Sequence, residues 1–163
     1  MPWGRSCDTV VLLAGGASPT LHVVDLHAPG VTVVEGRNLA GEGRDDLLLD
    51  GVTPLTSSRL DPAEDEAWDL RGALARTAAM AGVAEQVVQA TGRHLGERVQ
   101  FGRPLRAFQV MQHGLARLAA DSLAIQVAAE AAALALRDGG PGAPLVVAAA
   151  KAEASVLVRS VTT

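Results

Sequence analysis

The feature that most constrains this fold is a change of hydrophobic period after Ser57. Apolar or small residues then recur in alternating steps of three and four, at Leu70, Leu74, Thr77, Ala81, Ala84, Val88, Thr91 and Leu95. Such steps return to one helical face at every turn, so they predict a helix of more than about thirty residues, ending near Gln100. Asp61-Pro62-Ala63-Glu64 marks its start, with Asp as N-cap, Pro at the first helical position and Glu near the positive end of the dipole.

Two more helices are predicted farther along the chain. The second runs to Arg137 and repeats the three–four steps at Met111, Leu115, Leu118, Ser122 and Ile125. Residues 139–142 (Gly-Gly-Pro-Gly) break it, and the third begins near residues 143–145 and continues to Thr163. Long helices with narrow Ala and Leu stripes pack as antiparallel bundles. We therefore expect an incomplete four-helix bundle, completed by a further segment or by another subunit; a free-standing three-helix bundle is the alternative.

Residues 1–60 carry the shorter period of β-strands. β-branched and apolar residues gather in four segments, at residues 8–14, 20–26, 31–35 and 46–52. Gly15-Gly16-Ala17-Ser18-Pro19 predicts a hairpin loop between the first two. Four strands separated by turn residues indicate a meander or part of a barrel. The predicted fold class is α+β, with a partial antiparallel β-barrel domain in residues 1–60 and a truncated helical bundle domain in residues 61–163.

Composition argues against several classes of protein. A net charge of −4 is unlike the basic excess of a nucleic-acid binder. The single cysteine, Cys7, excludes an internal disulfide, and its place beside an apolar strand favours a core role over a nucleophile. No segment resembles a signal peptide, and the Ala-rich residues 127–136 are too short to span a bilayer and contain Glu130. We expect a cytoplasmic protein that binds neither nucleic acid nor membrane.

The turn between the first two helices is the candidate site. Four arginines lie close together there, at Arg93, Arg98, Arg103 and Arg106. Because Gly102 and Pro104 reverse the chain, Arg98 and Gln109 are expected at the same end of the helical hairpin. Guanidinium groups match phosphate oxygens in bidentate geometry, and the N-terminal amides of the second helix favour anions as well. The alternative is that the arginines only complement the negative end of the first helix.

These residues also resemble a known family. The turn matches the corner between two bundle helices of acyl-CoA dehydrogenases in its Arg98, its Phe101-Gly102, its Phe108-Gln109, its Gln112-His113 and its Leu115-Ala116. Residues 8–31 look like that family's middle β-domain, residues 48–52 like its following strand, and residues 148–155 like its next bundle helix. The resemblance covers nearly the whole chain and is strongest over residues 70–135.

The resemblance implies a cofactor and a partner. In acyl-CoA dehydrogenases FAD lies at a subunit interface, so Arg98 and Gln109 are expected to reach the pyrophosphate and adenine end of the FAD of a second subunit, of the same or another chain. Phe101 matches a residue that packs near the same cofactor. The implied activity is FAD-dependent α,β-dehydrogenation of an acyl-CoA thioester.

The chain departs from the family at the positions that carry the chemistry. The family's usual catalytic Glu lies on a later segment that this sequence does not contain, and the alternative position early in the first long helix corresponds to Gly72. Asp69 is almost a full turn from Gly72, Ala73 stands where relatives often have a substrate-binding Arg, and Arg117 replaces a common Asp. We therefore predict no catalytic residue in this chain.

Other constellations are weak. The four histidines, His22, His27, His94 and His113, lack the spacing of a metal site, so no metal ligands are predicted. Two alternatives to an acyl-CoA dehydrogenase fragment stay open. One is a non-catalytic subunit or scaffold that lends its Arg98–Gln109 corner to the FAD of a partner, and the other is a helical interaction module without a cofactor.

Overall fold

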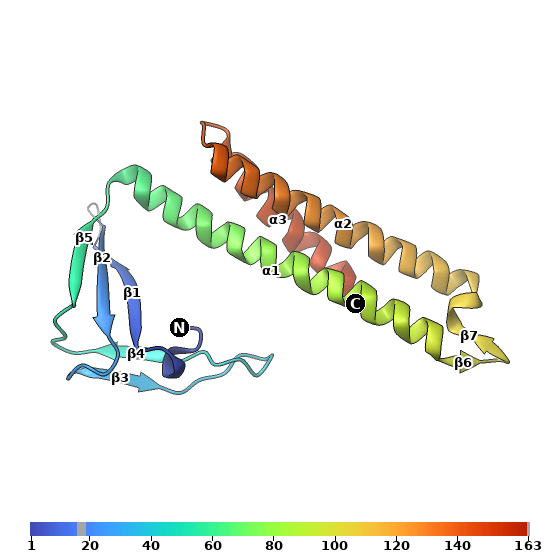
Figure 1. Ribbon diagram of the computed structural model, residues 1–163, viewed down its shortest axis with the longest axis horizontal. Helices are drawn as coiled ribbons and strands as arrows, with labels where there is room; N and C mark the ends of the chain where they lie inside the picture. The colour runs from blue at the N-terminus through green and yellow to red at the C-terminus, as the bar shows by residue number, and fades with distance from the viewer. Residues whose placement is uncertain (16–18, 163) are drawn as a thin grey trace. The chain divides into compact units, whose positions relative to one another are not determined.

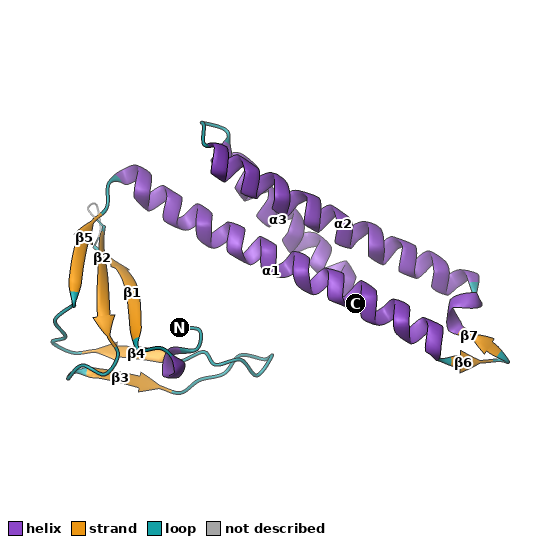
Figure 2. Ribbon diagram, in the orientation of Figure 1, coloured by secondary structure: helices purple, strands orange, loops and turns teal. Residues whose placement is uncertain are grey.

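A computed structural model gives the structure of the chain (Figures 1 and 2). It describes residues 1–15 and 19–162, without the side chains of residues 62–66 and 162. The chain forms two compact units, Met1–Glu66 with the main strands and Ala67–Thr163 with the helical bundle. The predicted α+β class is confirmed, and α1, Pro62–Glu97, leads from one unit into the other.

Two small antiparallel sheets make up the first unit. One has the order β1-β2-β5, formed by Thr9–Ala14, Thr20–Asp25 and Thr56–Arg59. The other pairs β3, Val31–Val34, with β4, Asp46–Leu49, and a short 3-10 helix, η1, covers Gly4–Ser6. The predicted β1–β2 hairpin is present with Ala14 opposite Thr20, although residues 16–18 of its loop lie outside the described residues.

Of the two arrangements expected for this unit, a meander and part of a barrel, the four-strand meander does not form. β2 pairs with β5 and not with β3. The two strands between them in the sequence, β3 and β4, form a separate sheet. β5 consists of Thr-Ser-Ser-Arg, and all four of its residues are exposed. An exposed edge strand needs no apolar alternation, because neither face must enter a core. That is why the apolar pattern does not reveal it.

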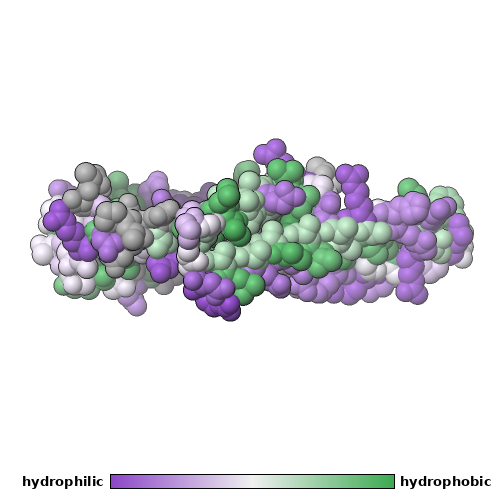
Figure 3. Space-filling view, turned by 90° about the horizontal axis from the view of Figure 1, so that it is seen from above, coloured by the Kyte–Doolittle hydropathy of each residue, from purple (hydrophilic) through white to green (hydrophobic). Residues whose placement is uncertain are grey.

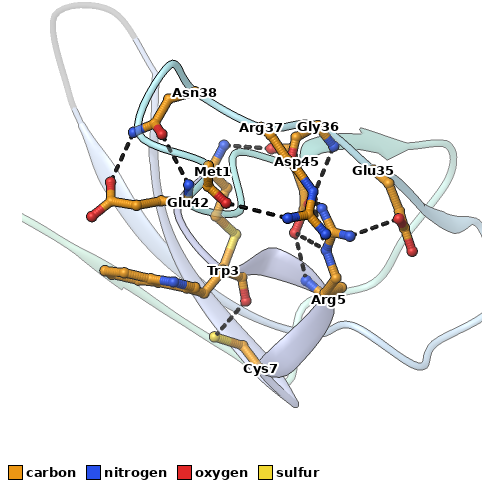
Figure 4. A network of polar contacts seen from close by, with 11 residues as sticks. Met1, Trp3, Arg5, Cys7, Glu35, Gly36, Arg37, Asn38, Glu42 and Asp45 are labelled. Carbon is orange, nitrogen blue, oxygen red and sulfur yellow. Dashed lines mark hydrogen bonds and ion pairs between the residues drawn. The ribbon is translucent and has the colours of Figure 1, made fainter.

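The core of this unit is built from residues of β1 and β2 and from the segment after β2. Val10, Val24 and Leu26 are buried, and Met1, Cys7, Leu12, Val31, Leu47 and Val52 pack against them. Cys7 is half-buried, and its Sγ lies 3.4 Å from the carbonyl oxygen of Trp3 (Figure 4). These contacts agree with the core role predicted for Cys7.

Gly30 is required by a close backbone approach between the segments that flank β3 and β4. Its φ is +89°, and a Cβ at this position would lie 2.1 Å from the carbonyl oxygen of Asp50. We expect Gly30→Ala to lower the free energy of unfolding by about 2–3 kcal/mol, since it combines a steric backbone cost with displacement of the facing chain. Urea unfolding followed by Trp3 fluorescence in a Trp68→Phe background measures this loss.

Gly51→Ala is the matched control for that substitution. Gly51 also has a positive φ, +63°, but a Cβ there meets nothing within 4 Å. It should therefore cost only the backbone term, about 1 kcal/mol. Equal losses at the two glycines would refute the role of the Gly30–Asp50 approach.

A buried carboxylate joins the beginning of the chain to the β3–β4 connection (Figure 4). The side chain of Asp45 is fully buried, and it accepts bonds from the backbone N–H of Arg5 at 2.8 Å and that of Gly36 at 3.1 Å. The Arg5 guanidinium adds bonds from Nε at 3.1 Å and Nη2 at 2.6 Å, while Nη1 reaches Glu35 at 2.6 Å. Hydrogen bonds from Arg5 hold the pKa of the Asp45 carboxyl well below its usual range, and the same pair raises the pKa of Arg5.

In the second unit, α1 presents the predicted stripe to the bundle. Thr77, Ala81, Ala84 and Leu95 of that stripe are buried, and the other four members are half-buried. The buried hydroxyl of Thr77 donates to the carbonyl oxygen of Ala73 at 2.9 Å. Its burial therefore leaves no unsatisfied donor in the core. α1 ends at Glu97, three residues before the expected end, because the chain turns there into a short hairpin.

The other two helices, α2 (Gln109–Asp138) and α3 (Ala143–Thr162), pack closely through small side chains. Ile125, Ala129, Ala154 and Val161 of these helices form one buried cluster with Ala81 and Ala84, and Ala132, Val147 and Ala150 form another. Alanine lets helix backbones approach, which explains how a chain with 2% aromatic residues still builds a core.

Much apolar surface of the bundle stays uncovered. Apolar residues, in green, run along the face of the helical unit seen in Figure 3. The exposed ones include Leu123, Val127, Leu134, Leu145 and Val156. Within the described residues, α2 also meets the length and composition of a membrane-spanning helix. Its buried stripe of Ser122, Ile125, Ala129 and Ala132 is used within the bundle.

Candidate functional site

A tight hairpin forms the predicted corner between α1 and α2, which comprises residues 98–109. β6, Val99–Gln100, pairs with β7, Arg103–Pro104, across a two-residue turn. The N–H of Leu105 donates to the carbonyl oxygen of Arg98 at 2.9 Å, so the intervening pair of Val99 and Pro104 is the non-hydrogen-bonded one. Pro104 lacks an N–H, and a residue in a non-hydrogen-bonded pair donates none to the opposite strand, so proline fits here.

The turn holds Phe101 in a left-handed conformation. φ is +52° at Phe101 and +77° at Gly102, as the twist of a two-residue hairpin requires. A left-handed conformation costs a residue with a side chain about 1–2 kcal/mol. The ring is nevertheless 90% exposed, so no burial offsets this cost within the chain. An exposed aromatic ring held at such a cost makes Phe101 a candidate binding residue.

The corner is cationic. Among the residues that the structure describes, none of Arg93, Arg98, Arg103 and Arg106 takes part in an ion pair, and all four are exposed. Phe108, the N-cap of α2, makes no side-chain capping bond, and the first turn of α2 has no acidic residue. Both features leave the positive end of the helix dipole uncompensated, and this favours a bound anion.

The structure places the three predicted site residues at this one corner. Arg98 directly follows α1, Phe101 is at the tip of the turn, and Gln109 is the first residue of α2. All three are exposed. A ligand shared by Arg98 and Gln109 stays a prediction.

One contact at the corner was not predicted from the sequence. The Arg103 guanidinium lies over the ring of Phe108, 4.1 Å from its centre. Phe101 meets the same ring edge-on, with the ring centres 6.1 Å apart and an interplanar angle of 79°. The signal in the sequence is a pair of phenylalanines that flank Arg103 and Arg106, and only the two-residue turn shows that Arg103 is the one that stacks.

A groove of ≈ 530 Å³ opens beside the corner, within the helical unit. Apolar side chains such as Leu95, Met111 and Leu118 form most of its lining. Arg117 and Asp121 supply its charges, and the Ser160 hydroxyl lies 2.6 Å from Oδ2 of Asp121. The groove thus combines an apolar floor with a few polar groups, as small-molecule sites do.

The two positions considered for a catalytic base, Asp69 and Gly72, lie on the exposed side of α1. Asp69 and Gly72 are both exposed, and a Cβ at Gly72 would meet nothing within 4 Å. Two histidines each have one polar side-chain partner. His22 Nδ1 lies 2.8 Å from Ser57 Oγ, and His27 Nε2 lies 3.1 Å from Asp8 Oδ1. The described residues contain no cluster of three or more metal-binding side chains.

Comparison with known proteins identifies the family. Residues 70–163 match the family model of the acyl-CoA dehydrogenase C-terminal domain. The chain belongs to the acyl-CoA dehydrogenase family. A curated relative, benzylmalonyl-CoA dehydrogenase of Aromatoleum aromaticum (strain DSM 19018 / LMG 30748 / EbN1), is 37% identical over 111 residues, which are 61% of this chain and 29% of the relative.

Several solved structures share the fold of the chain. A glutaryl-coenzyme A dehydrogenase in complex with glutaryl-CoA has a TM-score of 0.84 at 24% identity, with 98% of this chain covering 44% of that one. A glutaryl-CoA dehydrogenase from Mycobacterium smegmatis in complex with FADH2 scores 0.73 at 19% identity, with 97% covering 44%. The ChsE4-ChsE5 complex from Mycobacterium tuberculosis scores 0.69 at 24% identity, with 98% covering 45%. The chain therefore spans less than half the length of each of these solved chains.

Proposed function

We propose that this chain supplies one side of the FAD site of an acyl-CoA dehydrogenase. In this proposal Arg98, Phe101 and Gln109 hold the pyrophosphate and adenine end of a flavin that is shared with a second subunit, of the same or another chain. The observation that carries it is the corner itself, where arginines without an ion pair among the described residues, a helix N-terminus without a side-chain cap and an exposed Phe101 coincide. A structural neighbour solved in complex with FADH2 adds support from the family.

The donor set of the corner suits this end of FAD. Guanidinium groups and free helix amides suit phosphate oxygens, an amide side chain such as Gln109 donates and accepts, and an exposed ring offers a stacking surface. A bound flavin would supply the hydride acceptor for the acyl chain. Arg98, Phe101 and Gln109 would hold and orient the cofactor in the proposed site.

Proton removal is assigned to residues outside this chain. A general base must lie within hydrogen-bond reach of the substrate's α-proton. Gly72 has no side chain, and Asp69 is three residues away on a helix, almost a full turn. We therefore propose that acyl-CoA turnover needs a carboxylate from a partner subunit or from a further segment.

The test is a titration of the purified chain with FAD, followed by flavin fluorescence and by absorbance near 450 nm. We expect Arg98→Ala to weaken FAD binding by about 10–100-fold, because a charge-assisted bond to phosphate contributes about 1.5–3 kcal/mol. Gln109→Ala, which removes a neutral group, should weaken it by less than about tenfold. Arg71→Ala, which removes an exposed arginine near the start of α1, is the control and should leave the affinity unchanged.

A second candidate is a non-catalytic subunit that lends its corner to the flavin of a partner. The side-chain-free Gly72 favours it, and the ChsE4-ChsE5 complex is a structural neighbour that contains two named components. A chain that stays colourless alone and turns yellow when mixed with a catalytic partner would support this candidate. Activity on acyl-CoA with an artificial electron acceptor would then separate the enzyme from the cofactor holder. If flavin binds in no combination, both candidates fail and a cofactor-free interaction module is left.

A further inference from the structure

A second groove of the helical unit lies between α1 and α3, two helices that run in the same direction. Each of them is antiparallel to α2 (Figure 1). The packed clusters give their register: Leu74 of α1 belongs to the cluster of Ala150. Ala81 of α1 belongs to the next cluster with Ala154. Residues at matching steps along α1 and α3 therefore lie at the same level of the bundle.

This groove has a cationic end and an apolar end. Its volume is ≈ 460 Å³, and it is lined by Arg76, Ala79, Met80, Val83, Lys151 and Val158. The step from Arg76 to Val83 equals the step from Lys151 to Val158, so the two cations lie at one end and the two valines at the other. A helix rises roughly 10 Å over this step, which sets the distance between the two ends. None of the described residues that line the groove is acidic.

The two cations of the groove have no acidic partner. Neither Arg76 nor Lys151 takes part in an ion pair among the residues that the structure describes. Lys151 Nζ donates to Ser155 Oγ at 2.8 Å, and that hydroxyl donates to the carbonyl oxygen of Lys151 at 2.7 Å. This neutral hydroxyl directs the ammonium without offsetting its charge, and an ammonium has three donors. Because two like charges on one groove repel, an anion bound between them is favoured.

We propose that the groove between α1 and α3 binds a free fatty carboxylate of medium length. The carboxylate lies between Arg76 and Lys151, and the alkyl chain covers Met80, Val83 and Val158. A ligand with one anionic end and one apolar end matches the polarity of the groove, and the volume is in the range of small-molecule sites. A guanidinium binds a carboxylate in bidentate geometry, and an ammonium adds a point charge.

Burial of the tail adds to the affinity of this ligand. Val83 is 54% exposed, so an alkyl chain over it removes apolar surface of both partners from water. The inference goes beyond the proposed function and does not depend on FAD, since no residue of the corner at 98–109 lines this groove.

The test is isothermal titration calorimetry of the full chain with decanoate, below the concentration at which decanoate forms micelles. Arg76→Ala and Lys151→Gln should each weaken binding by about tenfold or more, because each removes a charge-assisted bond to the carboxylate. Lys151→Arg keeps the charge and should retain most of the affinity. Arg71→Ala removes an exposed arginine of α1 that does not line the groove, and it should have no effect. Decanol has the tail without the charge, so its weaker binding should not change in Arg76→Ala.

The tail has its own arm of the test. Each methylene removed between decanoate and hexanoate should weaken binding by about two- to fourfold. Val83→Asp places a like charge at the apolar end and should abolish decanoate binding with unchanged helix content by circular dichroism. Val156→Asp changes a valine of α3 that is 67% exposed and outside the groove, and it should bind decanoate as the wild type does.

Lys151 also reports which ligand covers the groove, because it is the only lysine of the chain. Decanoate should slow the reductive methylation of Lys151, measured by peptide mass spectrometry, and leave the rate at the N-terminal amine unchanged. Binding without this protection, or equal weakening of decanoate and decanol by Arg76→Ala, would overturn the proposed site. Protection that grows with protein concentration in the absence of decanoate would overturn it too, because a second copy of the chain would then cover the groove. A chain that binds decanoate but not FAD would leave this inference intact and refute the proposed function, and the reverse result would refute this inference alone.

Discussion

Replacing Ile125 with alanine is expected to lower the free energy of unfolding of the helical unit by about 3–5 kcal/mol. Ile125 is 0% exposed and lies in the cluster that joins all three long helices. The other buried members of this cluster are mostly alanines, which are too short to move into the space that the lost atoms leave. The cost therefore includes the cavity as well as the lost burial.

Circular dichroism at 222 nm measures this effect, because the long helices are almost entirely in the second unit. For a unit of this size the loss corresponds to a fall in the unfolding temperature of roughly 12 °C or more. Leu123→Ala is the matched control, since Leu123 is on the same helix but is 59% exposed. If the two variants lose the same stability, the proposed core at Ile125 is wrong.

The helices are the part of this fold that the sequence predicts best, and the reason is their length. A three–four stripe repeated over many turns averages out single exceptions, so the polar Thr77 and Ser122 belong to it and are buried as it requires. In the first unit each strand has only four to six residues, and β5, the second pairing partner of β2, lies more than thirty residues after it. Period alone does not encode such a pairing.

In the candidate site, too, the sequence predicts some features and not others. Gly102 and Pro104 predict a chain reversal, and this reversal places Arg98 and Gln109 at one corner. The stacking of Arg103 on Phe108 depends on the two-residue turn, and that turn places Phe101 where glycine or asparagine is usual. The tertiary structure overrides local preference here, and such conflicts occur most often at functional sites.

Removing the charge of Asp45 is expected to destabilise the first unit strongly, and only above acidic pH. Asp45→Asn leaves the Arg5 guanidinium with only the exposed Glu35 as a counter-charge, which we expect to lower the unfolding temperature of this unit by roughly 10 °C at pH 7. In the wild-type chain, the unfolded carboxyl takes up a proton near pH 4, whereas the folded one stays ionised because its pKa is lowered. Below that pH the unfolded state therefore binds more protons, and the contribution of Asp45 declines as the pH falls.

The difference between wild type and Asp45→Asn should therefore be constant from neutral pH to about pH 5 and shrink below about pH 4. Trp3 fluorescence in a Trp68→Phe background follows this unit, since Trp3 lies next to η1. Asp46→Asn changes the adjacent carboxylate, which is exposed, and should keep the wild-type profile. A constant difference down to pH 2 would mean that Asn fails sterically and that the Arg5–Asp45 ion pair is not what holds the chain's first turn to β4.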